Sequence, residues 1–362
     1  MQTLAELPTP SVLVDRARLD ANVRGMQAIC DQHGVELRPH IKTHKMVEVA
    51  RRQLAAGARG LTCAKIGEAE AMLPSGVRSL FIAHSLVDPN QAPRLAALAE
   101  RLDDLRVAVT SEPHADALER LAQNVGRRLN VMMAVDTGLG REGVRDDATA
   151  LRLASRLARS SRLELRGFYC HEGFFYGLAP DQYDLRIATM LDRLCSLRDR
   201  IDPSLALWPG CSVSARRVAA IGAGRIQAVR PGAYPFGDLS LTRTTGVMPK
   251  EALALHVLAT VVDKPESGLA LIDAGSKTFS SDRTPDGIHA LPADGRDFAV
   301  VRLNEEHGYV RGPATDSLEI GERLLLVPAH VCTVINLTDR VVVTEAGQPV
   351  ATWTVEGRGK TQ

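Results

Sequence analysis

Three features are scarce in this sequence: excess charge of one sign, long apolar runs and paired cysteines. The net charge of +1 disfavours a nucleic-acid-binding protein, because counterion-driven binding needs a concentrated basic surface. No segment approaches the roughly 18 apolar residues of a membrane helix, and the N-terminus MQTLAELPTP lacks the pattern of a signal peptide. Six cysteines without a CxxC pair do not form a disulfide framework. We therefore expect a cytoplasmic protein with neither nucleic acid nor membrane as a partner.

The chain has 362 residues, of which 45% are hydrophobic, so it is long enough for an α/β barrel with an additional domain. After a first strand at Ser11–Asp15, short apolar runs alternate with amphipathic stretches of helical periodicity. The runs that we predict as barrel strands are Glu36–Lys42, Gly60–Lys65, Ser79–His84, Leu105–Thr110, Leu129–Asp136, Leu163–His171, Leu205–Ser212 and Ile226–Tyr234. Eight successive βα units predict a parallel (β/α)8 barrel, since each crossover helix covers the outer face of the sheet.

The alternation of strands and helices stops near Asp238. From about Ala252 the sequence contains only strand-like runs separated by turn residues, which predicts a mainly β domain. These runs are LALHVLATVV, GLALIDAG, FAVVRLN, RLLLVPAHVCTVINL, RVVVTEAG and ATWTVEG. We predict a barrel domain at 16–240 and a β domain at 241–362.

Catalytic groups of such barrels lie at the C-terminal ends of the strands. The first βα unit ends in RPHIKTHK, which places Lys42 at the barrel mouth. A lysine that loses hydration there becomes a nucleophilic amine, as an imine with an aldehyde cofactor requires. The alternative is an ordinary lysine whose ammonium group reaches solvent.

The seventh and eighth predicted strands end in WPGCS and RPGAY. Small residues there let backbone N–H groups approach a phosphate, and such barrels repeatedly bind phosphate after these two strands. The candidates are Gly210, Cys211, Ser212, Gly232 and Tyr234. Each glycine is alternatively a turn residue with positive φ.

The fifth unit contains GLGREG, which matches the glycine spacing of a dinucleotide-binding fingerprint. Such a fingerprint must open a helix directly after the first strand of its unit, whereas here a helix is expected only after Asp146-Asp147. We therefore reject a nicotinamide site. Arg141 of this loop is then a cation at the barrel mouth that can face a phenolate or carboxylate, or alternatively pair with Glu142 or Asp146.

The sixth unit ends in FYCHEG. The two-residue alternation of a strand places Tyr169 and His171 on the same side. They can pack on a flat ring or donate a hydrogen bond, and a histidine satisfied within the core is the alternative.

In PAHVCTVINL, His330 and Cys332 lie two residues apart, so on a strand they project from one face. An imidazole and a thiolate suit zinc, although two ligands are fewer than a closed zinc site uses and buried cysteines are often inert. His307 in NEEHG is a further candidate partner of this site.

Seven motifs taken together carry a family resemblance: TPSVLVD, RPHIKTHK, VDTGLGREGV, RPGAYPFGD, LIDAGSK, NEEHG and HVC. They resemble the D-threonine aldolase and D-serine dehydratase family over nearly the whole chain, from about Thr9 to Glu356. Members of that family are similar to alanine racemase, with a barrel that binds pyridoxal 5'-phosphate (PLP), a β domain and, usually, a homodimer. The resemblance also implies that the N-terminal segment 1–15 belongs to the β domain.

The resemblance implies a role for each candidate residue. Lys42 would hold PLP as a Schiff base, Arg141 would approach its phenolic oxygen, and Tyr169 would lie beside its ring or the substrate. His171, on the same side of the strand as Tyr169, is a further candidate for binding the cofactor. The two loops at 210–212 and 232–234 would hold the phosphate. His330 and Cys332 would bind a divalent metal, with zinc favoured over manganese or magnesium, next to the β-hydroxyl of a D-amino acid.

The resemblance leaves two lyase reactions open. H-x-C is typical of the dehydratase members and H-x-D of the aldolases, so we favour elimination of water from a β-hydroxy D-amino acid over retro-aldol cleavage to glycine and an aldehyde. An amino-acid racemase would need a second base, for which Tyr309 is the only tyrosine of the β domain. A non-catalytic PLP carrier would not need the β domain with NEEHG and HVC.

Overall fold

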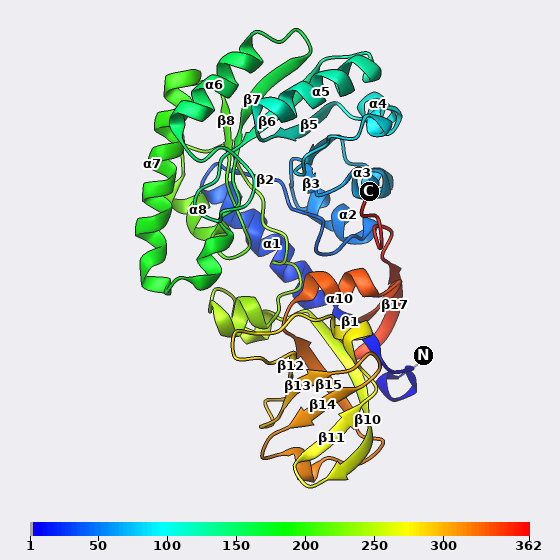
Figure 1. Ribbon diagram of the computed structural model, residues 1–362. Coiled ribbons are helices and arrows are strands. Elements are labelled where there is room, and N and C mark those ends of the chain that lie inside the picture. Colours follow the sequence, from blue (N-terminus) through cyan, green and yellow to red (C-terminus); the bar gives the residue numbers. More distant parts are fainter. Residues whose placement is uncertain (1–2) are drawn as a thin grey trace. The chain divides into compact units, whose positions relative to one another are not determined.

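The computed structural model describes residues 3–362, and the chain divides into two compact units (Figure 1). The barrel unit contains residues 24–42, 49–232 and 360–362, and the β unit contains residues up to Val23, 43–48 and 233–359. The change of unit at 232/233 precedes the expected boundary at 240/241, and the segment 43–48 lies in the β unit although it follows the first barrel strand. Met1 and Gln2, within the expected segment 1–15, lie outside the described residues.

Eight parallel strands between residues 36 and 229 form the barrel unit. They are β2 (Glu36–Leu37), β3 (Leu61–Cys63), β4 (Ser79–Ile82), β5 (Asp104–Val109), β6 (Leu129–Ala134), β7 (Leu163–Tyr169), β8 (Ala206–Trp208) and β9 (Ala228–Val229). Strands β3 to β8 form one sheet in sequence order, and β2 pairs with β9. Main-chain hydrogen bonds from Ile41 N to Thr62 O (2.8 Å) and from Gln227 N to Leu207 O (3.1 Å) join the two sheets. The predicted (β/α)8 barrel is confirmed.

The barrel helices also follow the prediction. They are α1 (Arg16–Gln32), α2 (Val47–Ala55), α3 (Ile66–Met72), α4 (Ala92–Arg101), α5 (Glu112–Val125), α6 (Asp147–Ala158), α7 (Tyr183–Ile201) and α8 (Ala215–Ile221). In α4, Leu95, Leu98 and Ala99 are buried at helical spacing while Arg101 is exposed. No helix within residues 3–362 is long and apolar enough to span a membrane.

Most barrel strands are shorter than predicted at their C-terminal ends. The first stops at Leu37 instead of Lys42, and the last stops at Val229 instead of Tyr234. Prolines account for both ends, because Pro39 and Pro231 carry no N–H with which to continue a ladder. The residues beyond them form the loops in which the candidate catalytic groups lie.

Aromatic rings fill the barrel interior. Phe81 makes edge contacts with Tyr169 and Trp208, with centroid distances of 4.9 and 5.8 Å. The guanidinium groups of Arg38 and Arg106 lie over the Trp208 ring, at 4.3 and 4.4 Å. The barrel is therefore a packed core that positions its strand ends rather than a pore.

The β unit contains a nine-stranded sheet in the order β11-β14-β13-β12-β15-β10-β1-β16-β17. The strands are β1 (Ser11–Asp15), β10 (Leu255–Glu266), β11 (Leu269–Ile272), β12 (Ala290–Pro292), β13 (Ala299–Leu303), β14 (Gly308–Arg311), β15 (Arg323–Pro328), β16 (Arg340–Glu345) and β17 (Gln348–Thr354). The N-terminal strand β1 lies between β10 and β16 and pairs with both.

The prediction was incomplete in the β unit. It missed the short strands β12 and β14, and it extended one strand through PAHVCTVINL. The chain instead leaves β15 at Pro328 and forms helix α10 (Val331–Leu337). Val331, Val334 and Ile335 are fully buried at helical spacing, so their burial favours the helix over a continued strand.

Candidate active site

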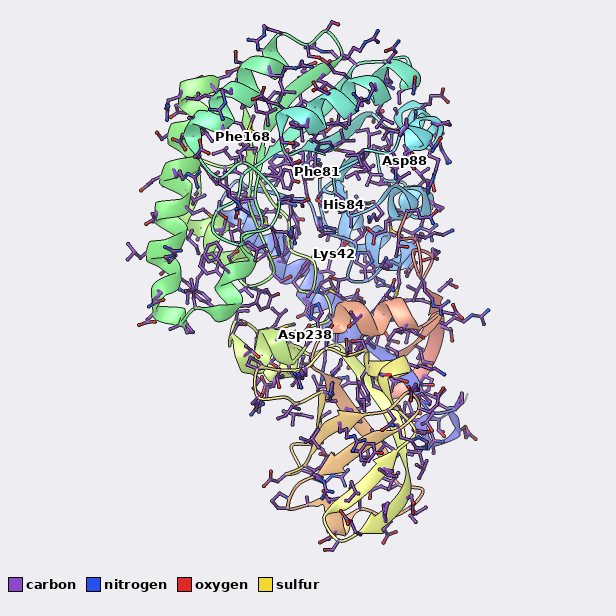
Figure 2. All side chains as sticks on the ribbon, viewed as in Figure 1. Lys42, Phe81, His84, Asp88, Phe168 and Asp238 are labelled. Carbon is purple, nitrogen blue, oxygen red and sulfur yellow. The ribbon has the colours of Figure 1, made fainter. Side chains whose placement is uncertain are left out.

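Lys42, which is labelled in Figure 2, lies in the turn that follows β2, after the bridge residue His40. Its side chain is half-buried, and its backbone N–H donates to His40 Nδ1 at 3.3 Å. The positive charge of Lys42 acts on His171, which lies just beyond the end of β7. Burial, together with the positive charges of Lys42, Arg141 and Arg230, lowers the pKa of His171 to about 3. His171 is therefore a neutral imidazole among cations at the ends of the strands.

Arg141, Tyr169 and His171 line one small pocket at this end of the barrel unit, together with Leu139 and Glu142. Tyr169 is 4% exposed, and its hydroxyl is buried with no hydrogen-bond partner among the described residues. Burial is the main cause that raises the pKa of Tyr169 above its ordinary value. A buried hydroxyl without a partner is costly, so a polar group of a bound molecule would stabilise it.

The glycine loop at 138–143 folds around its own carboxylate. Asp136 accepts hydrogen bonds from the N–H groups of Gly138, Leu139 and Gly140, at 3.0 to 3.2 Å. Helix α6 begins only at Asp147 with Asp146 as its N-cap, as expected when the dinucleotide fingerprint was rejected. Arg141 is 55% exposed and forms a loose ion pair with Glu142 at 3.6 Å.

Two amides of the candidate phosphate loops already have acceptors within the protein. Gly210 N donates to Glu172 Oε1 at 2.7 Å, and Gly232 N donates to Ser212 Oγ at 3.1 Å. Gly210 has φ +131°, and a Cβ there would approach Arg230 N to 2.6 Å, so its glycine is required by conformation. A phosphate bound by these loops would therefore be held by loop groups other than the N–H groups of Gly210 and Gly232.

The remaining loop candidates are distributed over both units. Cys211 is buried with its thiol 3.3 Å from Ser214 Oγ, and burial raises its pKa to about 11. Ser212 and Gly232 lie in the barrel unit, whereas Tyr234, buried at 6% exposure, belongs to the β unit.

Glu172 is a residue of this region that the sequence analysis did not identify. It is fully buried and accepts hydrogen bonds from Gly210 N, Ser214 Oγ (3.1 Å) and Cys170 Sγ (3.1 Å). Its carboxylate thus fixes the loop after β8. The one sequence feature that could have indicated Glu172 is its position next to His171 in the motif FYCHEG.

The candidate metal ligands lie at the start of α10 in the β unit rather than on a strand. His330 is the extended N-cap residue, and Cys332 is in the first turn. The expected strand geometry is therefore wrong, but the turn from β15 into α10 still brings the two side chains together. The Thr43 hydroxyl, buried at 1% exposure, lies 3.2 Å from Cys332 Sγ.

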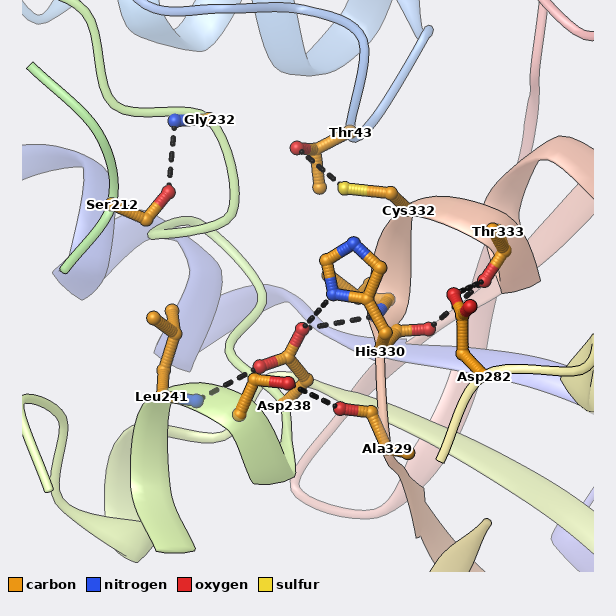
Figure 3. A network of polar contacts seen from close by, with 12 residues as sticks. Thr43, Ser212, Gly232, Asp238, Leu241, Asp282, Ala329, His330, Cys332 and Thr333 are labelled. Atoms are coloured by element: carbon orange, nitrogen blue, oxygen red, sulfur yellow. Dashed lines mark hydrogen bonds and ion pairs between the residues drawn. The ribbon is translucent and has the colours of Figure 1, made fainter. Parts of the chain in front are cut away.

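Asp238 supports His330 from the opposite side (Figure 3). Its Oδ2 lies 3.0 Å from His330 Nδ1 and also accepts from Val331 N at 3.0 Å. Burial alone would lower the pKa of His330, but the charge of Cys332 and the hydrogen bond to Asp238 raise it to about 11. Metal binding would therefore displace a proton from this ring.

Within residues 3–362, no three His, Cys, Asp or Glu side chains gather in a metal-binding geometry. An ion held by His330 and Cys332 would have two protein ligands, fewer than the three of an ordinary catalytic zinc site, and would leave its other positions to water or substrate. His307 is exposed in the turn between β13 and β14, and Arg302 covers the ring of Tyr309 at 4.7 Å.

The family follows from comparison of the whole sequence. The model of the alanine racemase N-terminal domain matches residues 14–240, and that of a putative serine dehydratase domain matches residues 254–344. The chain belongs to the alanine racemase N-terminal domain family. This family uses PLP, so the barrel predicted from the alternation of strands and helices is the PLP-binding barrel of that family.

Two relatives span almost the whole of this alanine racemase-family chain. The D-threonine aldolase of Arthrobacter sp. is 32% identical, over 98% of this chain and 94% of the relative. The D-threo-3-hydroxyaspartate dehydratase of Delftia sp. (strain HT23) is 33% identical, over 91% and 92%. Both relatives are lyases, and this chain is a PLP-dependent lyase of the same kind.

Solved structures of related enzymes have the same fold as this chain. The D-threonine aldolase of Filomicrobium marinum has a TM-score of 0.89 at 28% identity, covering 99% of this chain and 97% of that one. A cysteine-to-alanine variant of D-threo-3-hydroxyaspartate dehydratase, in the metal-free form, has a TM-score of 0.87 at 29% identity, covering 98% and 99%. A second variant of that dehydratase replaces a histidine two residues earlier.

Proposed function

We propose that this chain is a PLP- and metal-dependent lyase that eliminates water from a β-hydroxy D-amino acid and yields a 2-oxo acid and ammonia. The observation that carries the proposal is the pairing of His330 with Cys332 at the start of α10. A histidine and a cysteine with the same spacing were the residues replaced in the variants of the related dehydratase.

The barrel unit offers groups that fit PLP. Lys42 supplies the amine for its aldehyde, and the neutral His171 and the unpartnered Tyr169 hydroxyl lie at the same strand ends. Arg141 supplies a cation for the phenolic oxygen. We assign the phosphate to the loops at 210–212 and 232–234, where Ser212 Oγ can accompany backbone amides.

The cofactor, Lys42 and the metal pair each have a separate role in the proposed reaction. PLP, when bound, supplies an electron sink for negative charge at the substrate's Cα. Lys42 is the residue that we propose as the general base that takes the α-proton. An ion held by His330 and Cys332 would supply Lewis acidity for departure of the β-hydroxyl.

Zinc is the ion that we propose, since imidazole and thiolate suit a borderline-soft metal whereas manganese and magnesium favour oxygen ligands. A homodimer and a cytoplasmic location complete the proposal. Light scattering on the PLP-loaded protein would test the dimer.

Retro-aldol cleavage is the second candidate, because a D-threonine aldolase is 32% identical over nearly the whole chain. It would use the same lysine and metal pair, but the proton removed would be that of the β-hydroxyl. Glycine and an aldehyde would then be the products.

Product analysis decides between the two reactions. The PLP-loaded protein is incubated with D-serine and with D-threonine, with zinc or manganese added separately. Pyruvate or 2-oxobutyrate with ammonia supports the proposal, whereas glycine and acetaldehyde from D-threonine would establish the aldolase. Lys42→Ala is expected to lose turnover of either kind, and full activity in that variant would overturn both.

A further inference from the structure

Asp238 is a fully buried carboxylate with a complete set of partners in the β unit. It follows the motif RPGAYPFG and precedes the short helical segment Ser240–Thr244. Its Oδ2 accepts from His330 Nδ1 and from Val331 N, and its Oδ1 accepts from Leu241 N, all at 3.0 Å. Three donors on one buried carboxylate fix its position and that of the groups that it holds.

The hydrogen bond from His330 determines which ring nitrogen can bind an ion. Because Nδ1 donates to Asp238, the lone pair of the neutral ring is on Nε2. Figure 3 shows that the second ring nitrogen is on the side that faces Cys332 and Thr43. A carboxylate behind a ligating histidine orients the ring, fixes the tautomer and raises the basicity of the ligand.

We infer that Asp238 is a positioning residue of the metal site, which holds His330 so that Nε2 converges with Cys332 Sγ on one ion. The inference rests on the proposed metal site and adds to it a residue that does not touch the ion. Asp238 also receives Val331 N at the start of α10, so one side chain sets both the ring and the helix turn that bears Cys332.

Asparagine is the informative replacement at position 238. Two of the three donors, Val331 N and Leu241 N, are backbone N–H groups, which cannot become acceptors, whereas His330 Nδ1 accepts only in the other ring tautomer. An amide oxygen at the Oδ2 position would keep His330 and Val331 but place an NH2 group against Leu241 N. The opposite orientation would keep Leu241 and place the NH2 group against His330 and Val331. Each orientation therefore leaves at least one donor facing another donor.

The test measures zinc affinity of the PLP-loaded protein by competition with a chromogenic chelator, in wild type, Asp238→Asn, His330→Ala and Ser240→Ala. We expect Asp238→Asn to bind zinc roughly 10- to 100-fold more weakly and His330→Ala to lose the site. Ser240→Ala is the matched control, because it removes a hydrogen bond from the same segment to Ala329 O (2.9 Å) and leaves the ring untouched. It should retain wild-type affinity.

Cobalt spectra separate positioning from general loss of structure. In Asp238→Asn, the thiolate-to-cobalt charge-transfer and d–d bands should shift, while the thermal unfolding profile of the metal-free variant shows that it is folded. Wild-type affinity and an unchanged cobalt spectrum in Asp238→Asn, with the site lost in His330→Ala, would overturn the inference alone. Absence of zinc binding in the wild type would overturn the proposed metal site itself.

A second measurement uses the wild type, in case Asp238→Asn does not fold. Nitrogen-15 spectra of histidine-labelled, zinc-loaded protein, assigned with His330→Ala, should show Nε2 as the metal-bound nitrogen and Nδ1 as protonated. Zinc on Nδ1 would contradict the inference.

Discussion

Glu172 in the barrel unit and Asp238 in the β unit are both buried carboxylates that are stabilised by hydrogen bonds, but from different kinds of donor. Both carboxylates are fully buried, and each accepts three hydrogen bonds. Without these donors, a buried charge would be neutralised or excluded. Glu172 fixes the loop after β8 that we assign to phosphate, and Asp238 fixes the imidazole that we assign to the metal.

The two carboxylates differ in the kind of donor that they receive. Asp238 has only N–H donors, whereas Glu172 receives one N–H from Gly210, one hydroxyl from Ser214 and one thiol from Cys170. A hydroxyl can rotate and become an acceptor, but a backbone N–H cannot. The environment of Asp238 therefore demands a carboxylate, and that of Glu172 should accept an amide.

The largest effect that we expect comes from Glu172→Ala. It leaves Gly210 N–H and the Ser214 hydroxyl buried without their acceptor, at about 1–3 kcal/mol for each unsatisfied group. The free energy of unfolding in urea should fall by about 3 kcal/mol or more, and the PLP content of the purified protein should fall with it. A variant with unchanged stability would show that the carboxylate does not hold this loop.

A smaller effect is expected on the thiolate side of the metal pair. Thr43→Val keeps the shape of the side chain and removes the hydroxyl that lies 3.2 Å from Cys332 Sγ. The lost bond, about 1 kcal/mol, should weaken zinc binding roughly fivefold. Thr43→Ser restores the hydroxyl and is the control, so equal weakening in both variants would point to packing rather than to the hydrogen bond.

The barrel could be predicted because its information is local. In runs such as Leu129–Asp136 and in amphipathic stretches such as that of α6, the apolar residues recur at the spacing of a strand or a helix, and this spacing indicates which residues are buried. The strand ends were less accurate, since Pro39 and Pro231 interrupt the ladders at positions that continue the apolar pattern. Lys42 was predicted as the last residue of the first strand, and it lies instead in the turn beyond that strand.

The candidate metal pair was predictable because one segment contains both partners. His330 and Cys332 were recognised by their spacing, although α10 rather than a strand brings them together. Glu172 and Asp238 were not recognised, because the donors that indicate their roles lie 38 residues away at Gly210 and 92 residues away at His330. A single acidic residue in a sequence gives no indication that distant N–H groups will bury it.

The smallest effect that we expect, and the closest test of the comparison, comes from Glu172→Gln. The amide oxygen can keep Gly210 N and Cys170 Sγ, which both donate to Oε1, and the amide NH2 can donate to Ser214 Oγ once that hydroxyl turns. The free energy of unfolding should change by less than about 1 kcal/mol, against about 1–3 kcal/mol for Asp238→Asn, where a donor must face a donor. Urea unfolding of both variants under one condition measures the contrast. If both variants lose the same free energy of unfolding, the loss of the buried charge determines the cost of each replacement. The ability of a donor group to become an acceptor would then have no effect.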